Sequence, residues 1–202
     1  MRHRMKRFFT FEGIDGSGKS TIIKEVSTQL KKHKYNVITT FEPTDTWLGK
    51  YVQEQIRSNT DPYVTSFTFI ADRIQHSKQI KEWIENDCIV LCDRYAESTY
   101  AYQSVQLEKS MNDPIYWLQE LSKDHIVIPD LTFYFRITPE QALGRIQHRN
   151  ELIPFEKQAF LQKVYNNYEQ LCKGKRFFIL DATQSISEIT DLCVKKIIKK
   201  IV

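Results

Sequence analysis

The sequence predicts an α/β protein of three layers, in which a five-stranded parallel sheet is flanked by helices. Three observations predict this fold class. Short apolar runs alternate along the chain with longer segments of helical periodicity. The runs are almost continuously apolar, which is typical of strands covered on both faces. The first run leads through three closely spaced glycines directly into a helical pattern.

Five segments are expected to be strands, because each is a short run of aromatic, β-branched and leucine side chains bounded by turn residues. The second run ends before Pro43, which cannot continue a strand. The expected strands are residues 7–11, 36–41, 88–92, 131–137 and 176–180.

Between the strands, apolar residues recur at three- and four-residue spacing, as Ile22, Val26 and Leu30 do. Helices that connect successive strands imply right-handed crossovers in a parallel sheet, whose ligands bind beyond the carboxyl ends of the strands. The expected helices are residues 19–32, 47–57, 64–85, 98–106, 113–122, 139–148, 156–173 and 185–200.

Length and composition indicate one domain over residues 1–202, with enough apolar side chains for a single core. The net charge of +4 fits an anionic small-molecule substrate and is too weak to indicate a nucleic-acid partner. The apolar run behind the basic N-terminal residues is too short for a secretory signal, and no run approaches the length of a transmembrane helix. We therefore expect a cytoplasmic protein without a membrane partner.

The segment GIDGSGKS, residues 13–20, matches the phosphate-loop pattern G-x-x-x-x-G-K-[ST] in full. Its glycines allow successive backbone N–H groups to surround an anion, and the start of the following helix adds partial positive charge. Lys19 is expected to reach the β- and γ-phosphates of ATP, and the Ser20 hydroxyl is expected to ligate Mg²⁺. The ATP-binding residues expected here are Gly13, Ile14, Asp15, Gly16, Ser17, Gly18, Lys19, Ser20 and Thr21.

Polar residues also follow two other expected strands. Asp93 comes directly after the third strand, where an aspartate beside a phosphate loop is typical of the residue that holds Mg²⁺ or its waters. Without such a loop, Asp93 and Arg94 would be interpreted as a helix cap and a surface cation. Glu42 follows the second strand, and a solvated loop charge is an equal interpretation of it.

Phe69 and Arg73 lie four residues apart in an expected helix and therefore share one face. An aromatic ring that stacks on a base and a guanidinium that binds a phosphate would together recognise a nucleoside monophosphate. Without further context, a core phenylalanine and a surface arginine are the favoured interpretation, so the assignment depends on the rest of the chain.

Taken in chain order, six motifs resemble the thymidylate kinase family: FEGIDGSGKST, EPT, FIADR, LCDRYAESTYAYQ, PDLTFYFRITPEQALGRI and LDATQ. They cover residues 11–184 in the family's order and spacing, and other nucleoside-monophosphate kinases lack the run DRYAESTYAYQ. The resemblance implies a P-loop NTPase fold with a short helical lid, here about residues 145–156, and usually a homodimer. It also implies that the γ-phosphoryl group of ATP passes to dTMP in the presence of Mg²⁺, which gives dTDP and ADP.

The resemblance implies roles for single residues at the acceptor site. Phe69 would stack on thymine, Gln103 would read the edge of the base, and Tyr102 would crowd the 2′ position of the sugar. Asp15 would meet the 3′-hydroxyl. The dTMP-binding residues implied are Asp15, Glu42, Arg57, Phe69, Arg73, Arg94, Thr99, Tyr102 and Gln103.

On the donor side, the resemblance places Arg94 between the two sets of phosphates. Phosphoryl transfer needs in-line positioning and cations rather than a strong base. The loop after the last strand would pack against adenine, so Asp181, Ala182 and Thr183 join Arg145 among the ATP-binding residues. The implied catalytic residues are Lys19, Asp93, Arg94 and Arg149, and the implied metal ligands are Ser20 and Asp93.

The sequence departs from the family pattern at two places. Phe41 stands where an arginine often precedes the Glu-Pro pair, so a cation near the acceptor phosphate is missing or comes from Arg57 or Arg73. The phosphate loop has no arginine between its glycines, a variant that generally places the catalytic cation on the lid. Arg149 is our first choice for that cation, and a surface charge is the alternative.

Two other functions are compatible with the phosphate loop. A deoxynucleoside kinase would accept thymidine itself, but Arg57, Arg73 and Arg94 would then face an uncharged 5′-hydroxyl. A P-loop ATPase module that acts on a nucleic-acid or protein partner receives little support from the mild net charge.

Overall fold

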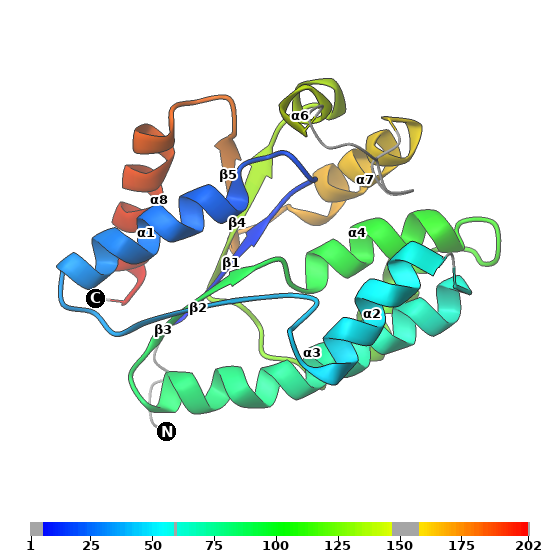
Figure 1. The fold of residues 1–202 in the computed structure, drawn as a ribbon, viewed down its shortest axis with the longest axis horizontal. Helices are drawn as coiled ribbons and strands as arrows, with labels where there is room; N and C mark the ends of the chain where they lie inside the picture. Colours follow the sequence, from blue (N-terminus) through cyan, green and yellow to red (C-terminus); the bar gives the residue numbers. More distant parts are fainter. Residues whose placement is uncertain (1–5, 59, 147–157, 202) are drawn as a thin grey trace.

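The computed structural model describes residues 6–58, 60–146 and 158–201. At its centre, five parallel strands form one sheet in the order β2-β3-β1-β4-β5 (Figure 1). The predicted α/β fold with a five-stranded parallel sheet is thereby confirmed. The strands are β1 (Phe8–Glu12), β2 (Val37–Phe41), β3 (Ile89–Asp93), β4 (Leu131–Arg136) and β5 (Phe177–Asp181).

Helices cover both faces of this sheet (Figure 1). On one face α1 packs against α8, and on the other face α3, α4 and α7 lie against the strands. α2 packs on α3, α5 packs on α3 and α4, and α6 follows β4 at the carboxyl end of the sheet. The helices are α1 (Lys19–Lys32), α2 (Trp47–Ser58), α3 (Pro62–Glu85), α4 (Ala96–Leu107), α5 (Pro114–Ser122), α6 (Pro139–Ile146), α7 (Gln158–Leu171) and α8 (Ile186–Ile201).

The central strand β1 shows why its sequence is apolar almost throughout, because all of its residues are buried. Phe9 and Phe11 point toward α1 and α8, and the ring of Phe11 packs against the Phe133 and Phe135 rings of β4. Phe8 points to the opposite face, where its ring centroid lies 5.0 Å from that of Tyr95. Side chains alternate across a strand, so Glu12 faces the same side as Phe8, toward α4 and α7.

The helix boundaries agree with the expected ones to within two residues where both ends are described. α3 begins at Pro62 rather than at residue 64, because the Asp61 carboxylate accepts hydrogen bonds from the backbone N–H groups of Tyr63 and Val64. Proline in the first turn and aspartate before it are both typical of a helix start. The expected helix ends at residues 148 and 156 lie outside the described residues.

Within the described ranges, no helix combines the length and the apolar character that crossing a membrane requires.

Candidate functional site

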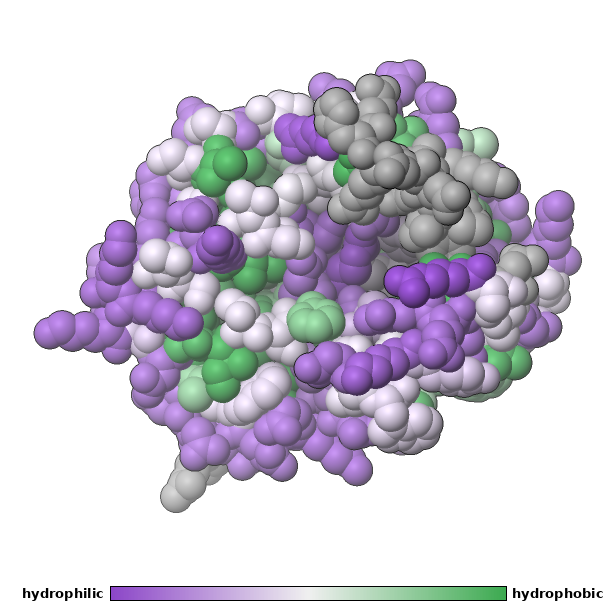
Figure 2. Space-filling model, in the orientation of Figure 1, coloured by the Kyte–Doolittle hydropathy of each residue, from purple (hydrophilic) through white to green (hydrophobic). Residues whose placement is uncertain are grey.

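The phosphate loop lies at the carboxyl end of β1 and leads directly into α1, as the motif predicts. Gly16 has a φ of +81° and approaches α6 so closely that a Cβ would lie 2.3 Å from the carbonyl oxygen of Ala142. Glycine is therefore required here both by the backbone conformation and by the available space. The loop borders a cavity of about 810 Å³. Figure 2 shows hydrophilic side chains in a hollow on this side of the molecule.

Lys19, the first residue of α1, is only 6% exposed. Its Nζ donates hydrogen bonds to the carbonyl oxygens of Gly13 and Ile14, at 2.9 and 3.0 Å, and to Oγ of Ser17 at 3.1 Å. Burial, helped by the nearby Arg94 guanidinium, lowers the pKa of Lys19 to about 8. The ammonium group thus lies inside the loop, where phosphate oxygens could replace the carbonyl oxygens as acceptors.

Ser20 and Asp93, the expected metal ligands, lie next to each other in the wall of this cavity. The Ser20 hydroxyl donates to Oδ2 of Asp93 at 2.5 Å. Among the described residues, no group of three or more His, Cys, Asp or Glu side chains could hold a metal ion. Magnesium beside a nucleotide usually takes one or two protein oxygens and completes its shell with phosphate and water. The residues present therefore fit a magnesium ion shared with phosphates.

A second cavity, of about 150 Å³, adjoins the first, and both are lined by Asp15, Glu42 and Arg94. Arg57 is not brought to either cavity: it is exposed in the last turn of α2, and its neighbour Ile56 lines the second cavity instead. The expected dTMP-binding residues that line the second cavity are Asp15, Glu42, Phe69, Arg73, Arg94, Thr99, Tyr102 and Gln103.

Arg94 lies where the two cavities meet. Its Nη2 donates to Oδ1 of Asp15 at 2.7 Å, and its Nη1 donates to the carbonyl oxygen of Gly13 and to Oγ of Ser98, both at 3.1 Å. A guanidinium fixed by three partners presents its charge at one place, which is what stabilisation of a transferring phosphoryl group requires.

Asp15 is the anion that balances Arg94. Burial by itself would raise the pKa of Asp15, but the Arg94 guanidinium and then the Lys19 ammonium lower it to about 2. Its second oxygen, Oδ2, accepts a hydrogen bond from the Tyr102 hydroxyl at 3.0 Å. The phosphate loop and α4 are therefore joined by an ionised carboxylate.

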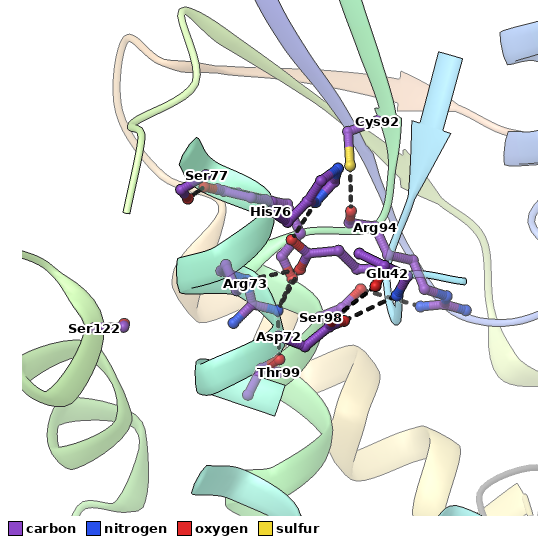
Figure 3. Close-up of polar contacts among 12 residues, drawn as sticks. Glu42, Asp72, Arg73, His76, Ser77, Cys92, Arg94, Ser98, Thr99 and Ser122 are labelled. Atoms are coloured by element: carbon purple, nitrogen blue, oxygen red, sulfur yellow. Dashed lines mark hydrogen bonds and ion pairs between the residues drawn. The ribbon is translucent and has the colours of Figure 1, made fainter. Parts of the chain in front are cut away.

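Glu42 and Arg73 form a buried ion pair behind the second cavity (Figure 3). Arg73 Nε donates to Oε2 of Glu42, and Arg73 Nη2 donates to Oγ1 of Thr99, each at 2.7 Å. Glu42 is 5% exposed and Arg73 is 1% exposed, so neither is a surface charge. Arg73 Nη1 is also buried, and it has no partner among the described residues, so it remains able to donate to a ligand.

Phe69 lies in the wall of the second cavity. The ring is half-buried and lines the second cavity, so it is not enclosed in the core. Gln103, one turn beyond Thr99 on α4, is almost fully buried and lines the same cavity. An aromatic face and an amide thus both border this space.

Two residues of α3 to which the sequence assigned no role hold this wall in place. His76 Nδ1 lies 2.9 Å from Oε1 of Glu42 (Figure 3), and its Nε2 lies 2.8 Å from Oγ1 of Thr40. Asp72 accepts hydrogen bonds from the backbone N–H and the hydroxyl of Thr44, at 2.8 and 2.6 Å. Both residues are close to Arg73 in α3, and this proximity was the one signal in the sequence that could have indicated them.

On the far side of the first cavity, Arg145 Nη2 donates to the carbonyl oxygen of Ala182 at 2.9 Å. Asp181 shapes the same loop, because its Oδ1 accepts from the backbone N–H and the hydroxyl of Thr183. The structure therefore brings Arg145 and the loop after β5 together beside the phosphate loop. Arg149, the expected lid cation, and most of the expected lid lie outside the described residues.

Comparison with known proteins agrees with the resemblance drawn from the motifs. The family model described as thymidylate kinase matches residues 11–192. A relative from Methanosarcina barkeri, named "Probable thymidylate kinase", is 39% identical over 197 residues, which are 96% of each chain. The thymidylate kinase of Acholeplasma laidlawii is 32% identical over 206 residues, covering 96% of this chain and 100% of the relative. The chain therefore belongs to the thymidylate kinase family.

Proposed function

We propose that this protein transfers the γ-phosphoryl group of ATP to dTMP and releases dTDP and ADP. The observation that carries the proposal is the junction of two cavities at Asp15, Glu42 and Arg94. One cavity begins at a phosphate loop, and the other is bordered by an aromatic ring, amide and guanidinium groups. A kinase that brings two nucleotides together through their phosphates needs such an arrangement. Family membership supports dTMP as the acceptor.

In this proposal the acceptor nucleotide occupies the smaller cavity. Phe69 stacks on the base, and Nη1 of Arg73, which has no partner in the part of the chain that the structure describes, donates to an oxygen of the base. Gln103 reads the edge of the base from α4. Asp15 and Tyr102, which are already hydrogen-bonded to each other, contact the sugar and leave little room at its 2′ position.

ATP occupies the larger cavity in this proposal. Lys19 and the loop N–H groups bind its β- and γ-phosphates, and adenine lies between Arg145 and residues 181–183. Ser20 and Asp93 would hold Mg²⁺, which neutralises charge on the phosphate oxygens when it is bound. Arg149 would supply a further cation from the lid.

Arg94 lies between the two sets of phosphates and stabilises the charge on the group in transfer. The attacking atom is an oxygen of the dTMP phosphate, which is already ionised, so no residue has to remove a proton. The chain instead orients the two nucleotides and surrounds the transferring group with fixed donors. A deoxynucleoside kinase and a P-loop ATPase module are less well supported, because neither is suggested by the family.

We also propose that the protein works as a cytoplasmic homodimer, as the family resemblance implies. Exposed apolar side chains at helical spacing, Trp47 and Tyr51 on α2 and Val64 and Phe67 on α3, offer a surface that a second copy could cover. Trp47→Glu should then shift the sedimentation coefficient from dimer to monomer, and a wild-type protein that sediments as a monomer would contradict this part of the proposal.

A panel of nucleoside monophosphates, assayed with ATP and Mg²⁺ by coupled release of ADP, tests the proposed reaction. We expect dTMP to give the highest kcat/KM, and thymidine without a phosphate to give no product. Turnover of thymidine alone would indicate the deoxynucleoside kinase. ATP hydrolysis that needs no nucleotide acceptor and increases with a polymer would indicate the ATPase module.

A further inference from the structure

Glu12 is a buried carboxyl group to which the proposed reaction assigns no role. It is the last residue of β1, directly before the phosphate loop, and it is 0% exposed. Its side chain points away from the loop, into the space between α4 and α7. Burial of a carboxyl group is unfavourable unless its oxygens are hydrogen-bonded, so its contacts indicate what it does.

One oxygen of Glu12 binds the start of α4. Oε1 accepts from the backbone N–H of Tyr95 at 2.7 Å and from that of Ser98 at 3.3 Å. These groups belong to the first turn of the helix, where backbone N–H groups lack i−4 partners; that of Ser98 also donates to the carbonyl oxygen of Tyr95 at 3.2 Å. Tyr95, at the capping position itself, makes no capping hydrogen bond with its own side chain. Glu12 therefore caps α4 from a different element of the fold.

The turn that Glu12 caps has a strained backbone. Arg94 has a φ of +66°, in the left-handed region that residues other than glycine rarely occupy. Its N–H donates to the carbonyl oxygen of Phe11 at 3.0 Å, and the next N–H, that of Tyr95, donates to Glu12. Two consecutive residues of β1, Phe11 and Glu12, thus accept hydrogen bonds from two consecutive backbone N–H groups of the turn. Such strain persists at functional sites when the surroundings fix it.

The same carboxyl group also reaches the Arg94 side chain, through one hydroxyl group. Ser98 Oγ donates to Oε2 of Glu12 at 2.6 Å. It also accepts from Nη1 of Arg94 at 3.1 Å (Figure 3). The Tyr168 hydroxyl, from α7, donates to the same Oε2 at 3.0 Å. Both the backbone and the guanidinium of Arg94 are therefore connected to Glu12.

We propose that Glu12 is a positioning residue, which holds Arg94 at the junction of the two cavities by binding the start of α4 to the phosphate-loop strand. The inference rests on the proposed function, because the test detects a displaced Arg94 as a lower turnover of dTMP. Glu12 contacts neither cavity, so its effect passes through Ser98 and the turn at Arg94. A purely structural role would instead change stability alone.

The test compares two substitutions at Glu12 in the full-length protein. Glu12→Leu removes both acceptors at similar volume, and we expect kcat to fall about 100-fold, because small errors in the placement of catalytic groups are this costly. Glu12→Gln keeps a carbonyl oxygen for the two N–H groups and should restore kcat to within about tenfold of wild type. The KM for ATP should stay within about twofold in both variants, because Lys19 and its loop are unaltered.

Asp130→Asn is the matched control. The Asp130 carboxylate accepts from the N–H of Phe8 at the opposite end of β1, at 2.9 Å, and Asp130 lines neither cavity. This control should lower the melting temperature without changing kcat. Wild-type kcat in Glu12→Leu, or a loss of kcat in proportion to the loss of folded protein, would overturn the inference. Wild-type protein that does not phosphorylate dTMP would instead refute the proposed function.

If Glu12→Leu does not fold, a cycle of Glu12→Gln and Ser98→Ala decides the question. Because both changes act on Arg94 through the same hydroxyl, their losses of kcat should overlap, and the double variant should be within about twofold of the worse single variant. Losses that multiply would show two independent effects and would overturn the inference.

Discussion

The two cavities that meet at Arg94 are built in different ways. The larger one depends on the backbone of one short segment, in which positive φ angles and missing side chains create the site for phosphate. The smaller one depends on side chains from α3 and α4, held by a buried network around Glu42 and Arg73. A backbone site is defined by neighbouring residues, whereas a side-chain site is defined by residues that only the fold brings together.

The largest loss of turnover should come from a substitution of Lys19, the essential side chain of the phosphate loop. Lys19→Met leaves the loop in place but removes the charge that reaches the phosphates, so kcat should fall about 1,000-fold. The melting temperature should change little, and steady-state kinetics with dTMP and ATP measure the loss. Lys24→Met, an exposed position on the same helix, is the control. Near-normal turnover in Lys19→Met would remove the assigned role of the loop.

The Glu12 carboxyl group allows the link between the two sites to be examined through pH. Burial, followed by the nearby Glu97 carboxylate, raises the pKa of Glu12 from 4.5 to about 7, although Arg94, Ser98 and Tyr168 lower it. A raised pKa in the folded state means that stability from this group is complete below pH 4.5 and is lost as the pH rises through about 7.

The free energy of unfolding of the wild type should therefore fall by up to about 3 kcal/mol between these pH values, compared with that of Glu12→Gln, which has no such ionisation. Urea unfolding of both proteins across this range measures the difference. Parallel curves for the two proteins would show that Glu12 does not ionise in this window.

A smaller effect, and one confined to a single substrate, should come from the side-chain site. Phe69→Ala removes the ring that lines the smaller cavity, and stacking on a base is worth about 1 to 3 kcal/mol. We expect the Kd for dTMP, measured by calorimetry, to rise about 10- to 100-fold, with that for ATP within about twofold. Tyr116→Ala, which removes an exposed ring on α5 that lines neither cavity, serves as the control. Equal losses for both nucleotides would show that Phe69 only packs.

The same contrast explains how far the sequence could be interpreted. The strand, loop and helix around Gly16 and Lys19 are contiguous, and their hydrogen bonds are local, so spacing alone predicted this site and its place at the end of β1. Burial of Glu42 depends on α3, which follows it by about 20 residues. Periodicity could not show that Arg73 turns inward to meet this carboxylate, and the order of the family's motifs implied only that Glu42 and Arg73 each belong to the acceptor site.

Other features had no local signal. His76 is a histidine on a helix, and its two hydrogen bonds to β2 and the following loop arise only when α3 packs beside that strand. Glu12 lies between the first expected strand and the phosphate motif, where the sequence gives it no role, and its contacts with α4 and α7 come from residues up to 156 positions away. Arg57 was predicted from the family pattern; it is exposed on α2 and lines neither cavity, so its contact with the acceptor phosphate stays a prediction.

Phe41 provides the smallest and most discriminating change, because it lies between the two kinds of site. It is the last residue of β2, is 48% exposed, pairs with Asp93 across the ladder and lines the larger cavity. Phe41→Arg restores the cation that the family often has, and a partly exposed charge should lower the KM for dTMP about threefold. Phe41→Met, which removes the ring without adding charge, is the control.

The substrate whose KM changes shows to which cavity this position belongs. A fall in the KM for dTMP that is weaker at high salt would place the new charge near the acceptor phosphate, since exposed charge interactions are screened. A fall confined to ATP would assign the end of β2 to the donor cavity that Phe41 lines, and the acceptor phosphate would then depend on Arg94 alone among the arginines that the structure places at the junction.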